Sequence, residues 1–199
     1  MIFVNRNNIV DICSRANLEK DIAQTKSIRP DFTKIFNEES LGVYACASKL
    51  NEKLKATTHA IDHVCIVVPP SGPSNELFKL TEESNQEKIA DSFRKMFTPK
   101  AHLFFTNSLV GSQIAIDFNY DSEITTINSD LNGNEQLYSF LQLKLQEERL
   151  THCLAIMVFP EKNRIKGLLL RSQKINADDF AIKTKDEFIN FILEMDNGQ

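Results

Sequence analysis

Residues 123–133 read EITTINSDLNG, and this short stretch decides how the rest of the chain is interpreted. Its first half, residues 123–128, is rich in β-branched side chains and predicts a strand. Turn-forming residues follow as far as Gly133, and a helix is then predicted from Asn134 to about Leu150. A strand that passes through a tight turn into a helix places Asp130 near free backbone N–H groups and the positive end of the helix dipole.

The helix after this turn has apolar side chains around much of its circumference. They are Leu137, Tyr138, Phe140, Leu141, Leu143 and Leu145. A helix that is apolar on most sides is typical of a buried position, so the pattern predicts a central helix.

Further strands are predicted on both sides of the deciding stretch. The apolar runs 63–68 and 153–159 are each followed by proline, and both predict strands that are buried on two faces. Residues 2–12 predict an opening strand or hairpin. Residues 164–173 predict the hairpin partner of 153–159.

Helices are predicted between these strands. Apolar spacing indicates helices at 39–54 and 108–118, and the pairs Ser84/Glu87 and Thr184/Glu187 match capping boxes for helices that end near residues 98 and 195. The alternation of strands and helices predicts an α/β fold with a mostly parallel, mixed sheet and helices on both faces.

Composition and charge narrow the class of protein. The chain has 199 residues, of which 42% are hydrophobic and 25% charged, as expected for one domain over 1–199. The net charge is −4 and no basic stripe is present, which argues against binding to nucleic acid. The longest apolar run is too short to span a membrane, and the N-terminus resembles no signal peptide, so we expect a cytoplasmic protein.

The cysteines and histidines suggest neither disulfides nor a metal site. Cys13, Cys46, Cys65 and Cys153 form no CxxC pair and are expected to be reduced, mostly buried thiols. His63 with Cys65, and His152 with its neighbour Cys153, lack a second ligand pair at zinc-site spacing. The segment 71–74 has one glycine and no following Gly-Lys-Ser, so it does not predict a phosphate loop. We expect no metal and no cofactor.

Two segments carry a resemblance to a known family. Residues 105–118 read FTNSLVGSQIAIDF, and residues 124–133 read ITTINSDLNG. Together they resemble the N-terminal half of the β-ketoacyl synthases, the thiolase-fold enzymes that condense acyl groups. In that family a similar asparagine-led helix precedes a strand that delivers the active cysteine, followed by a small residue, Ser or Thr, and Gly. The resemblance covers about residues 41–173 and implies a layered, thiolase-like half-fold, with the helix near 184–195 outside it.

The departures from the family matter for function. Counting back from Gly133, Asp130 takes the place of the nucleophile, and a carboxylate cannot serve as the acyl-carrying thiolate. The four histidines of this chain, His59, His63, His102 and His152, match neither of the two catalytic histidines in the family's C-terminal half. The resemblance therefore implies a chain that does not condense acyl groups.

The resemblance also implies partners. Family members are dimers built largely through this half, and some pair an active synthase with a chain-length factor that lacks the cysteine. We therefore expect a non-catalytic subunit that pairs with a ketosynthase, or with itself, in fatty-acid or pigment-type polyketide biosynthesis, and that helps to shape the acyl pocket or the docking of an acyl carrier protein. The candidate interface residues are Asn107, Thr125, Ile127, Asn128, Ser129 and Asp130.

Three alternatives remain open at this point. Asp130 could be a plain helix-start residue among the cap formers around it. The chain could be an acyl-thioester hydrolase or transferase that uses Asp130 as a base. It could also be a self-associating domain in which strand 123–128 pairs across a twofold axis. Since the family's second half is absent from this sequence, we further expect an exposed apolar patch that the helix at 184–195 covers only in part.

Overall fold

The computed structural model describes residues 1–13, 20, 23, 36, 38–54, 61–68, 86–96, 108–120, 123–128, 133–146, 151–159, 164–174 and 177–196. In chain order the helices and strands are β1 (Ile2–Cys13), α2 (Glu38–Leu54), β2 (His63–Val68), α4 (Gln86–Met96), α6 (Ser108–Phe118), β3 (Glu123–Asn128), α7 (Gly133–Gln146), β4 (His152–Phe159), β5 (Arg164–Arg171), β6 (Asp179–Ile182) and α8 (Lys185–Asp196). The predicted order of elements is confirmed, with one strand, β6, added to it.

The strands form a mixed sheet in the order β3-β2-β4-β5-β1-β6. Strand β2 lies between β3 and β4 and runs parallel to both. Strand β5 returns antiparallel to β4, β1 runs antiparallel to β5, and β6 runs antiparallel to β1. Strands β1 to β4 therefore share one direction, and β5 and β6 point the other way. The predicted α/β class with a mixed sheet is confirmed. The sheet is not mostly parallel, however, because β5 returns as a hairpin from β4 and β1 and β6 then add antiparallel, so three of the five strand pairings are antiparallel.

Strand β6 was not predicted from the sequence. It has only four residues, Asp179–Ile182, which is too short for a two-residue period to be recognised. Its partner is the beginning of β1, where Ile2 lies opposite Ile182 and Asn5 lies opposite Asp179. The position of β6 at the end of the sheet is thus determined by pairing with a strand more than 170 residues away.

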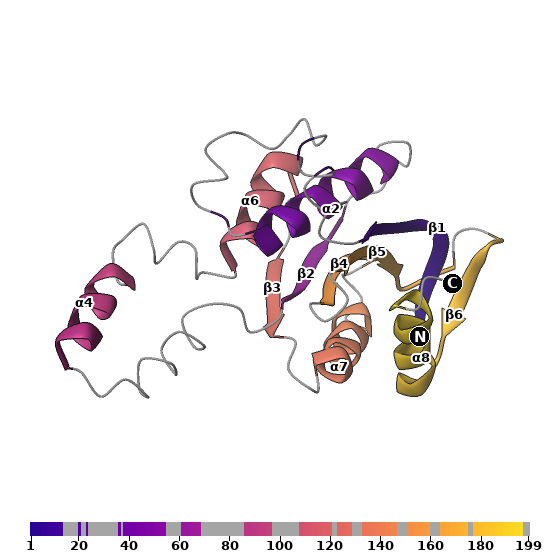
Figure 1. The fold of residues 1–199 in the computed structure, drawn as a ribbon. Helices are drawn as coiled ribbons and strands as arrows, with labels where there is room; N and C mark the ends of the chain where they lie inside the picture. Colours follow the sequence, from indigo (N-terminus) through magenta and orange to yellow (C-terminus); the bar gives the residue numbers. More distant parts are fainter. Residues whose placement is uncertain are drawn as a thin grey trace.

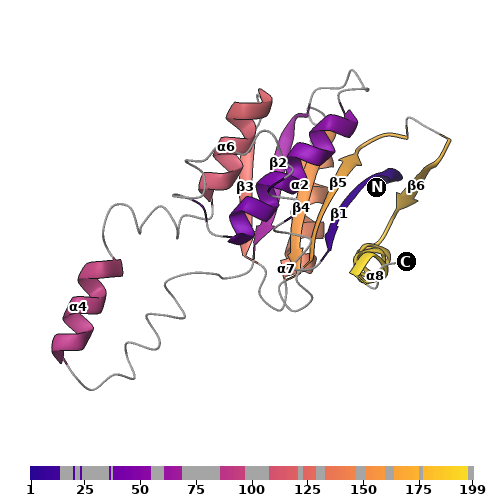
Figure 2. The same cartoon turned by 45° about the horizontal axis from the view of Figure 1, so that its top comes forward.

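Helices cover both faces of the sheet (Figures 1 and 2). Helices α2 and α6 lie on one face, and α7 and α8 lie on the other. Strand β2 shows how both faces are filled, because Val64 and Ile66 pack with α2 and α6 while Cys65 between them packs with α7 and α8. The described side chains of these apolar runs, residues 63–66 in β2 and 153–158 in β4, are therefore buried on two faces, as predicted.

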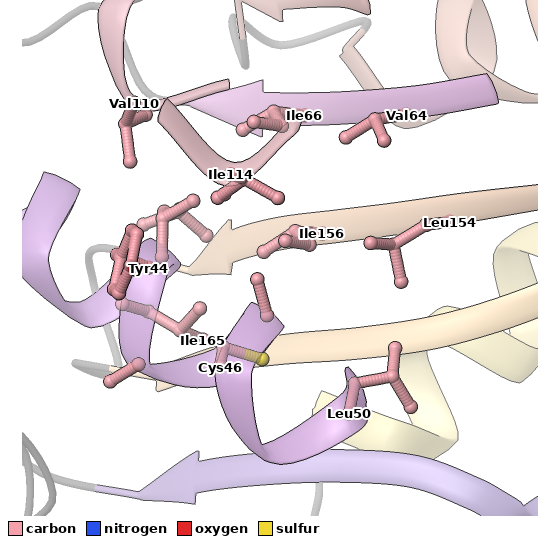
Figure 3. Close-up of a cluster of buried hydrophobic side chains, with 14 of the residues drawn as sticks. Tyr44, Cys46, Leu50, Val64, Ile66, Val110, Ile114, Leu154, Ile156 and Ile165 are labelled. Carbon is pink, nitrogen blue, oxygen red and sulfur yellow. The ribbon is translucent and has the colours of Figure 1, made fainter. Parts of the chain in front are cut away.

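Helices α2 and α6 approach the sheet closely at two glycines. A Cβ atom on Gly167 of β5 would lie 2.9 Å from Cys46 Sγ, and one on Gly111 of α6 would lie 2.7 Å from Ile124 Cγ2. Both distances are too short for real side chains, so each glycine leaves the space that a neighbouring element fills. Figure 3 shows the resulting cluster, in which Cys46 and Leu50 of α2 face the strands.

Helix α7 differs from its prediction as a buried central helix. Its inner side chains, such as Leu137 and Leu141, are fully buried, but Leu143 is 59% exposed. Glu135, Gln136 and other polar residues share the exposed side with Leu143. The prediction was wrong because it counted apolar residues without noting that Glu135, Gln136, Ser139 and Gln146 form a polar stripe along the helix.

The start of α8 is confirmed. Thr184 Oγ1 accepts a hydrogen bond of 3.2 Å from the backbone N–H of Glu187, as in a capping box. The Glu187 carboxylate accepts a second bond, of 2.6 Å, from the backbone N–H of Lys183, one residue before the usual donor. The other predicted capping residue, Ser84 before α4, lies outside the described residues. None of the described helices is both long enough and apolar enough to cross a membrane.

Candidate functional site

Both elements of the predicted strand-to-helix junction are present in the structure. Strand β3 ends at Asn128 and helix α7 begins at Gly133. Because β3, β2 and β4 are parallel, this junction lies at the carboxyl edge of the three strands. Asn107, Ser129 and Asp130 lie outside the described residues, so the placement of Asp130 at the apex of the turn stays a prediction.

Two of the candidate interface residues point toward helix α7 rather than outward. Thr125 Oγ1 lies 3.1 Å from His63 Nε2 of the neighbouring strand, and Ile127 packs against the buried cluster on the α7 side. Both side chains are partly buried, and β3 is the last of the described strands on this side of the sheet. Asn128 is the last residue of β3.

A polar cluster that the sequence analysis missed lies at the amino end of β3. The imidazole of His63 is fully buried and stacks at a tilt on Phe140, with ring centroids 5.4 Å apart. Glu123 Oε2 lies 4.0 Å from His63 Nδ1 and accepts a hydrogen bond of 2.7 Å from Lys144 Nζ. This bond lowers the pKa of Glu123. Four side chains from separate parts of the sequence thus meet between β2, β3 and α7. They are His63, Glu123, Phe140 and Lys144.

A second polar group lies at the amino end of β4. Asp62 Oδ2 accepts hydrogen bonds from the hydroxyl and backbone N–H of Thr151 and from the backbone N–H of His152. Burial raises the pKa of Asp62, but these bonds outweigh that effect and the net shift is downward. Asp62 directly precedes β2, so its hydrogen bonds connect the beginning of β2 to the beginning of β4.

A buried ion pair joins the last strands at the other end of the sheet. Arg171 and Asp179 are 2% and 5% exposed, and Arg171 Nη1 lies 3.1 Å from Asp179 Oδ2. The side-chain amide of Asn5 donates a hydrogen bond of 2.9 Å to Asp179 Oδ1. This cluster connects β5, β1 and β6. Its role is structural, because it holds β6, the strand that was not predicted from the sequence, against β1 and β5.

The thiols with described side chains are deep inside the protein. Cys46, Cys65 and Cys153 are free and buried. Burial raises the pKa of Cys65 to about 12 and the pKa of Cys153 well above its usual value. A nucleophilic cysteine needs a lowered pKa and access to substrate, so these three thiols are unsuited to acyl transfer.

The histidine and cysteine pairs noted in the sequence are not close enough to a third ligand to suggest a metal site. Within the described part of the chain, no group of three His, Cys, Asp or Glu side chains could hold a metal ion. His63 and Cys65 share the α7 face of the sheet, whereas Cys153 packs on that face and its neighbour His152 points the other way.

Each of the two helices that contact β3 carries one exposed apolar side chain. Helices α6 and α7 contact β3 from opposite faces of the sheet (Figure 1). Ile116 of α6 is 72% exposed and Leu143 of α7 is 59% exposed. We refer to the outer edge of β3 together with Ile116 and Leu143 as the β3 edge surface. Apart from Met1, these are the exposed large hydrophobic residues in the described part of the chain, so the broad apolar patch expected from the sequence is not found there.

Comparison with solved structures identifies the fold. The chain superposes on a chain from the complex of a ketosynthase with its chain length factor from Xenorhabdus doucetiae, with a TM-score of 0.55 and 10% identity, covering 85% of this chain and 76% of that chain. The chain has a β-ketoacyl synthase-like fold. A β-ketoacyl synthase from Burkholderia phymatum STM815 gives a TM-score of 0.53 at 9% identity, covering 85% of this chain and 58% of that chain. No family model and no curated protein sequence matches the chain.

The β-ketoacyl synthase-like fold confirms the resemblance inferred from residues 105–118 and 124–133. At these levels of identity the likeness concerns the fold, and function has to be argued from the residues of this chain. The chain spans little more than half of the Burkholderia synthase.

Proposed function

We propose that this chain is a non-catalytic, β-ketoacyl synthase-like subunit that pairs with an active ketosynthase in fatty-acid or polyketide biosynthesis. In the complex it would help to shape the acyl pocket or the surface on which an acyl carrier protein docks. The observation that carries the proposal is a condensing-enzyme-like fold whose described thiols are all buried. In the sequence, Asp130 takes the place of the nucleophile. The thiols of Cys46, Cys65 and Cys153 are buried, and burial raises the pKa values of Cys65 and Cys153.

Loss of the thiol removes the first chemical step of condensation. That step transfers an acyl group from a thioester to an enzyme thiolate, which forms one thioester as another is broken. A carboxylate at position 130 would be stabilised near a helix N-terminus. Its acylation, however, would give a reactive mixed anhydride rather than a stable thioester. The role left to the chain is therefore one of binding.

The partner is proposed from the structural neighbour and from strand β3. The Xenorhabdus structure contains a ketosynthase together with its chain length factor, two proteins that assemble. In our chain, β3 ends the sheet among the described strands, and its residues 124–127 are Ile, Thr, Thr and Ile. An edge strand presents unpaired N–H and C=O groups to which another strand can add.

Strand β3 also lacks the features that usually prevent such pairing. Its six residues include no proline and no lysine, and its one charged side chain, Glu123, is already paired with Lys144. Ile116 and Leu143 are exposed on the two helices that contact β3, so a partner that covers these helices as well as the strand would also bury them. These observations favour the β3 edge surface as the docking surface.

Co-purification tests the proposed partner. A tagged form of this chain, co-expressed with a ketosynthase from the same gene neighbourhood, should retain that ketosynthase through affinity and size-exclusion chromatography. Failure of the two purified proteins to associate at micromolar concentrations would remove the ketosynthase as a partner. Light scattering of the chain alone then separates the outcomes, because a stable homodimer would favour self-pairing.

Acyl transfer provides a separate prediction. Incubation of the purified chain with acyl and malonyl thioesters should leave its intact mass unchanged, because no accessible thiolate is present in the described residues. An active ketosynthase, as the positive control, should gain the mass of one acyl group. Thioester turnover by this chain, abolished in the Asp130→Asn variant, would instead favour the hydrolase or transferase alternative.

A further inference from the structure

Among the described elements, helix α4 alone takes no part in the core. It has 11 residues, Gln86–Met96, and Figures 1 and 2 show it apart from the sheet and from the other helices. None of its described side chains belongs to either of the two buried clusters that lie on the faces of the sheet. The core of the described structure therefore does not hold α4 in place.

The sequence of α4 is nevertheless divided into an apolar side and a polar side. Positions 89, 93 and 96 lie on one side of the helix at the spacing i, i+4 and i+7, and they are occupied by Ile, Phe and Met. We refer to these three positions as the apolar side of α4. The described charged residues all lie on the opposite side and are exposed: Glu87, Lys88, Asp91 and Arg94. A helix with this division normally packs its apolar side against another element.

The length of α4 also indicates that it needs a packing partner. A helix shorter than about 12–15 residues is only marginally stable in water when it is isolated, and α4 has 11 residues. Most of the stability of helices in proteins comes from the packing of an apolar side against other elements. We therefore expect α4 to be stable only while its apolar side is covered.

The position of α4 indicates where its packing partner lies. In both views α4 lies beyond the end of the sheet that β3 forms, on the side away from β2. A strand that adds to β3 must lie on this same side, because β2 already pairs with the other edge of β3. A protein bound to the β3 edge surface would therefore lie next to α4.

The polar side of α4 favours a protein over a lipid surface as this partner. Helices that lie on anionic membranes carry mainly Lys and Arg on their polar side. In α4 the acidic residues Glu87 and Asp91 are mixed with Lys88 and Arg94, and Arg94 Nη1 lies 3.6 Å from Asp91 Oδ1. Because charges of both signs are present, the polar side offers no strong attraction to a negatively charged membrane.

We propose that α4 is an arm that packs its apolar side onto the protein that adds a strand to β3. The inference rests on the proposed function, in which this protein is a ketosynthase. The complex then has two contact areas, one in which backbone groups of β3 bond to a strand and one in which α4 lies in an apolar groove of the partner. Because a short helix becomes stable when it packs, binding should order α4.

Hydrogen exchange of the intact chain, alone and in the co-purified complex, tests the arm. In the free chain the α4 amides should exchange with little protection, because an isolated helix of this length is marginally stable. In the complex their exchange should slow by at least about ten-fold. Unchanged exchange in the complex would overturn the proposal. Strong protection of α4 in the free monomer would overturn it as well, because the chain itself would then cover the apolar side.

Two matched variants measure what the arm contributes to binding. Ile89→Ser with Phe93→Ser changes the apolar side and should raise the Kd for the ketosynthase by at least about ten-fold. Lys88→Ser with Asp91→Ser makes the same kind of change on the polar side and should alter the Kd by less than about two-fold. Both variants should unfold at the temperature of the wild type, because α4 lies outside the described core. Equal Kd values for the two variants would contradict the arm.

Failure of the arm and failure of the proposed function give different results. If a ketosynthase binds while α4 stays unprotected, the arm is wrong and the proposed function stands. If no ketosynthase binds but the chain pairs with itself, the proposed function is wrong, and exchange of α4 in the self-paired form decides the arm. A chain that binds no ketosynthase and stays monomeric would contradict both.

Discussion

The double variant Ile116→Glu and Leu143→Glu should fold normally and bind its partner at least about 100-fold more weakly than the wild type. Both side chains are more than half exposed, so the substitutions remove little buried area and should change the free energy of unfolding by less than about 0.5 kcal/mol. In the proposed complex, however, the partner covers α6 and α7 as well as β3, and each glutamate would be desolvated there. Losses of about 2 kcal/mol at central apolar positions correspond to more than ten-fold in Kd for each.

Titration calorimetry measures the loss, with the partner identified by co-purification or with light scattering if the chain pairs with itself. Lys174→Glu is the matched control, because Lys174 is also exposed but follows β5, away from β3. Thermal unfolding of each variant checks that the fold is retained. An unchanged Kd for the double variant would exclude the β3 edge surface as the docking surface, whichever partner is bound.

The second large effect is expected at the buried ion pair. Asp179→Ala should lower the free energy of unfolding by about 3–5 kcal/mol, because it leaves the guanidinium of Arg171 buried without its countercharge. The Asn5 amide would lose its acceptor in the same variant, which adds to the cost. Denaturation in urea, followed by circular dichroism, measures the difference.

A compensating variant separates the lost countercharge from simple loss of packing. Arg171→Met combined with Asp179→Leu removes both charges and keeps apolar volume, so it should be markedly more stable than Asp179→Ala. If Arg171→Met/Asp179→Leu were no more stable than Asp179→Ala, the packing of these side chains, rather than their charges, would hold β6 in the sheet. A single variant that loses less than about 1 kcal/mol would show that water reaches Arg171.

Much of the fold could be predicted from local patterns. The runs at β2 and β4 contain no polar alternation, which is typical of strands buried on both faces, and the structure places helices on both sides of them. Capping residues placed the start of α8 correctly. Strand β6 was missed because four residues carry too little periodic signal, and its pairing with β1 depends on contacts that are remote in sequence.

The candidate site was predictable in outline only. The spacing of residues 124–133 predicted a strand followed by a helix, and β3 and α7 confirm both elements. The cluster around His63 could not be predicted, because Glu123, Phe140 and Lys144 come together only when α7 packs beside β3. Exposure of Leu143 was missed for another reason: Glu135, Gln136, Ser139 and Gln146 mark a polar side of the same helix, and this pattern could have been seen in the sequence.

The sequence by itself predicted which chemistry is missing: the resemblance puts Asp130 where the condensing enzymes have a cysteine, and this assignment stays a prediction because residue 130 lies outside the described residues. Only the tertiary structure decided that β3 ends the sheet among the described strands and that His63 is enclosed behind it. The physical reason is that the kind of chemical group belongs to the residue itself, whereas its burial, its pKa and its position at an edge depend on which distant segments pack together.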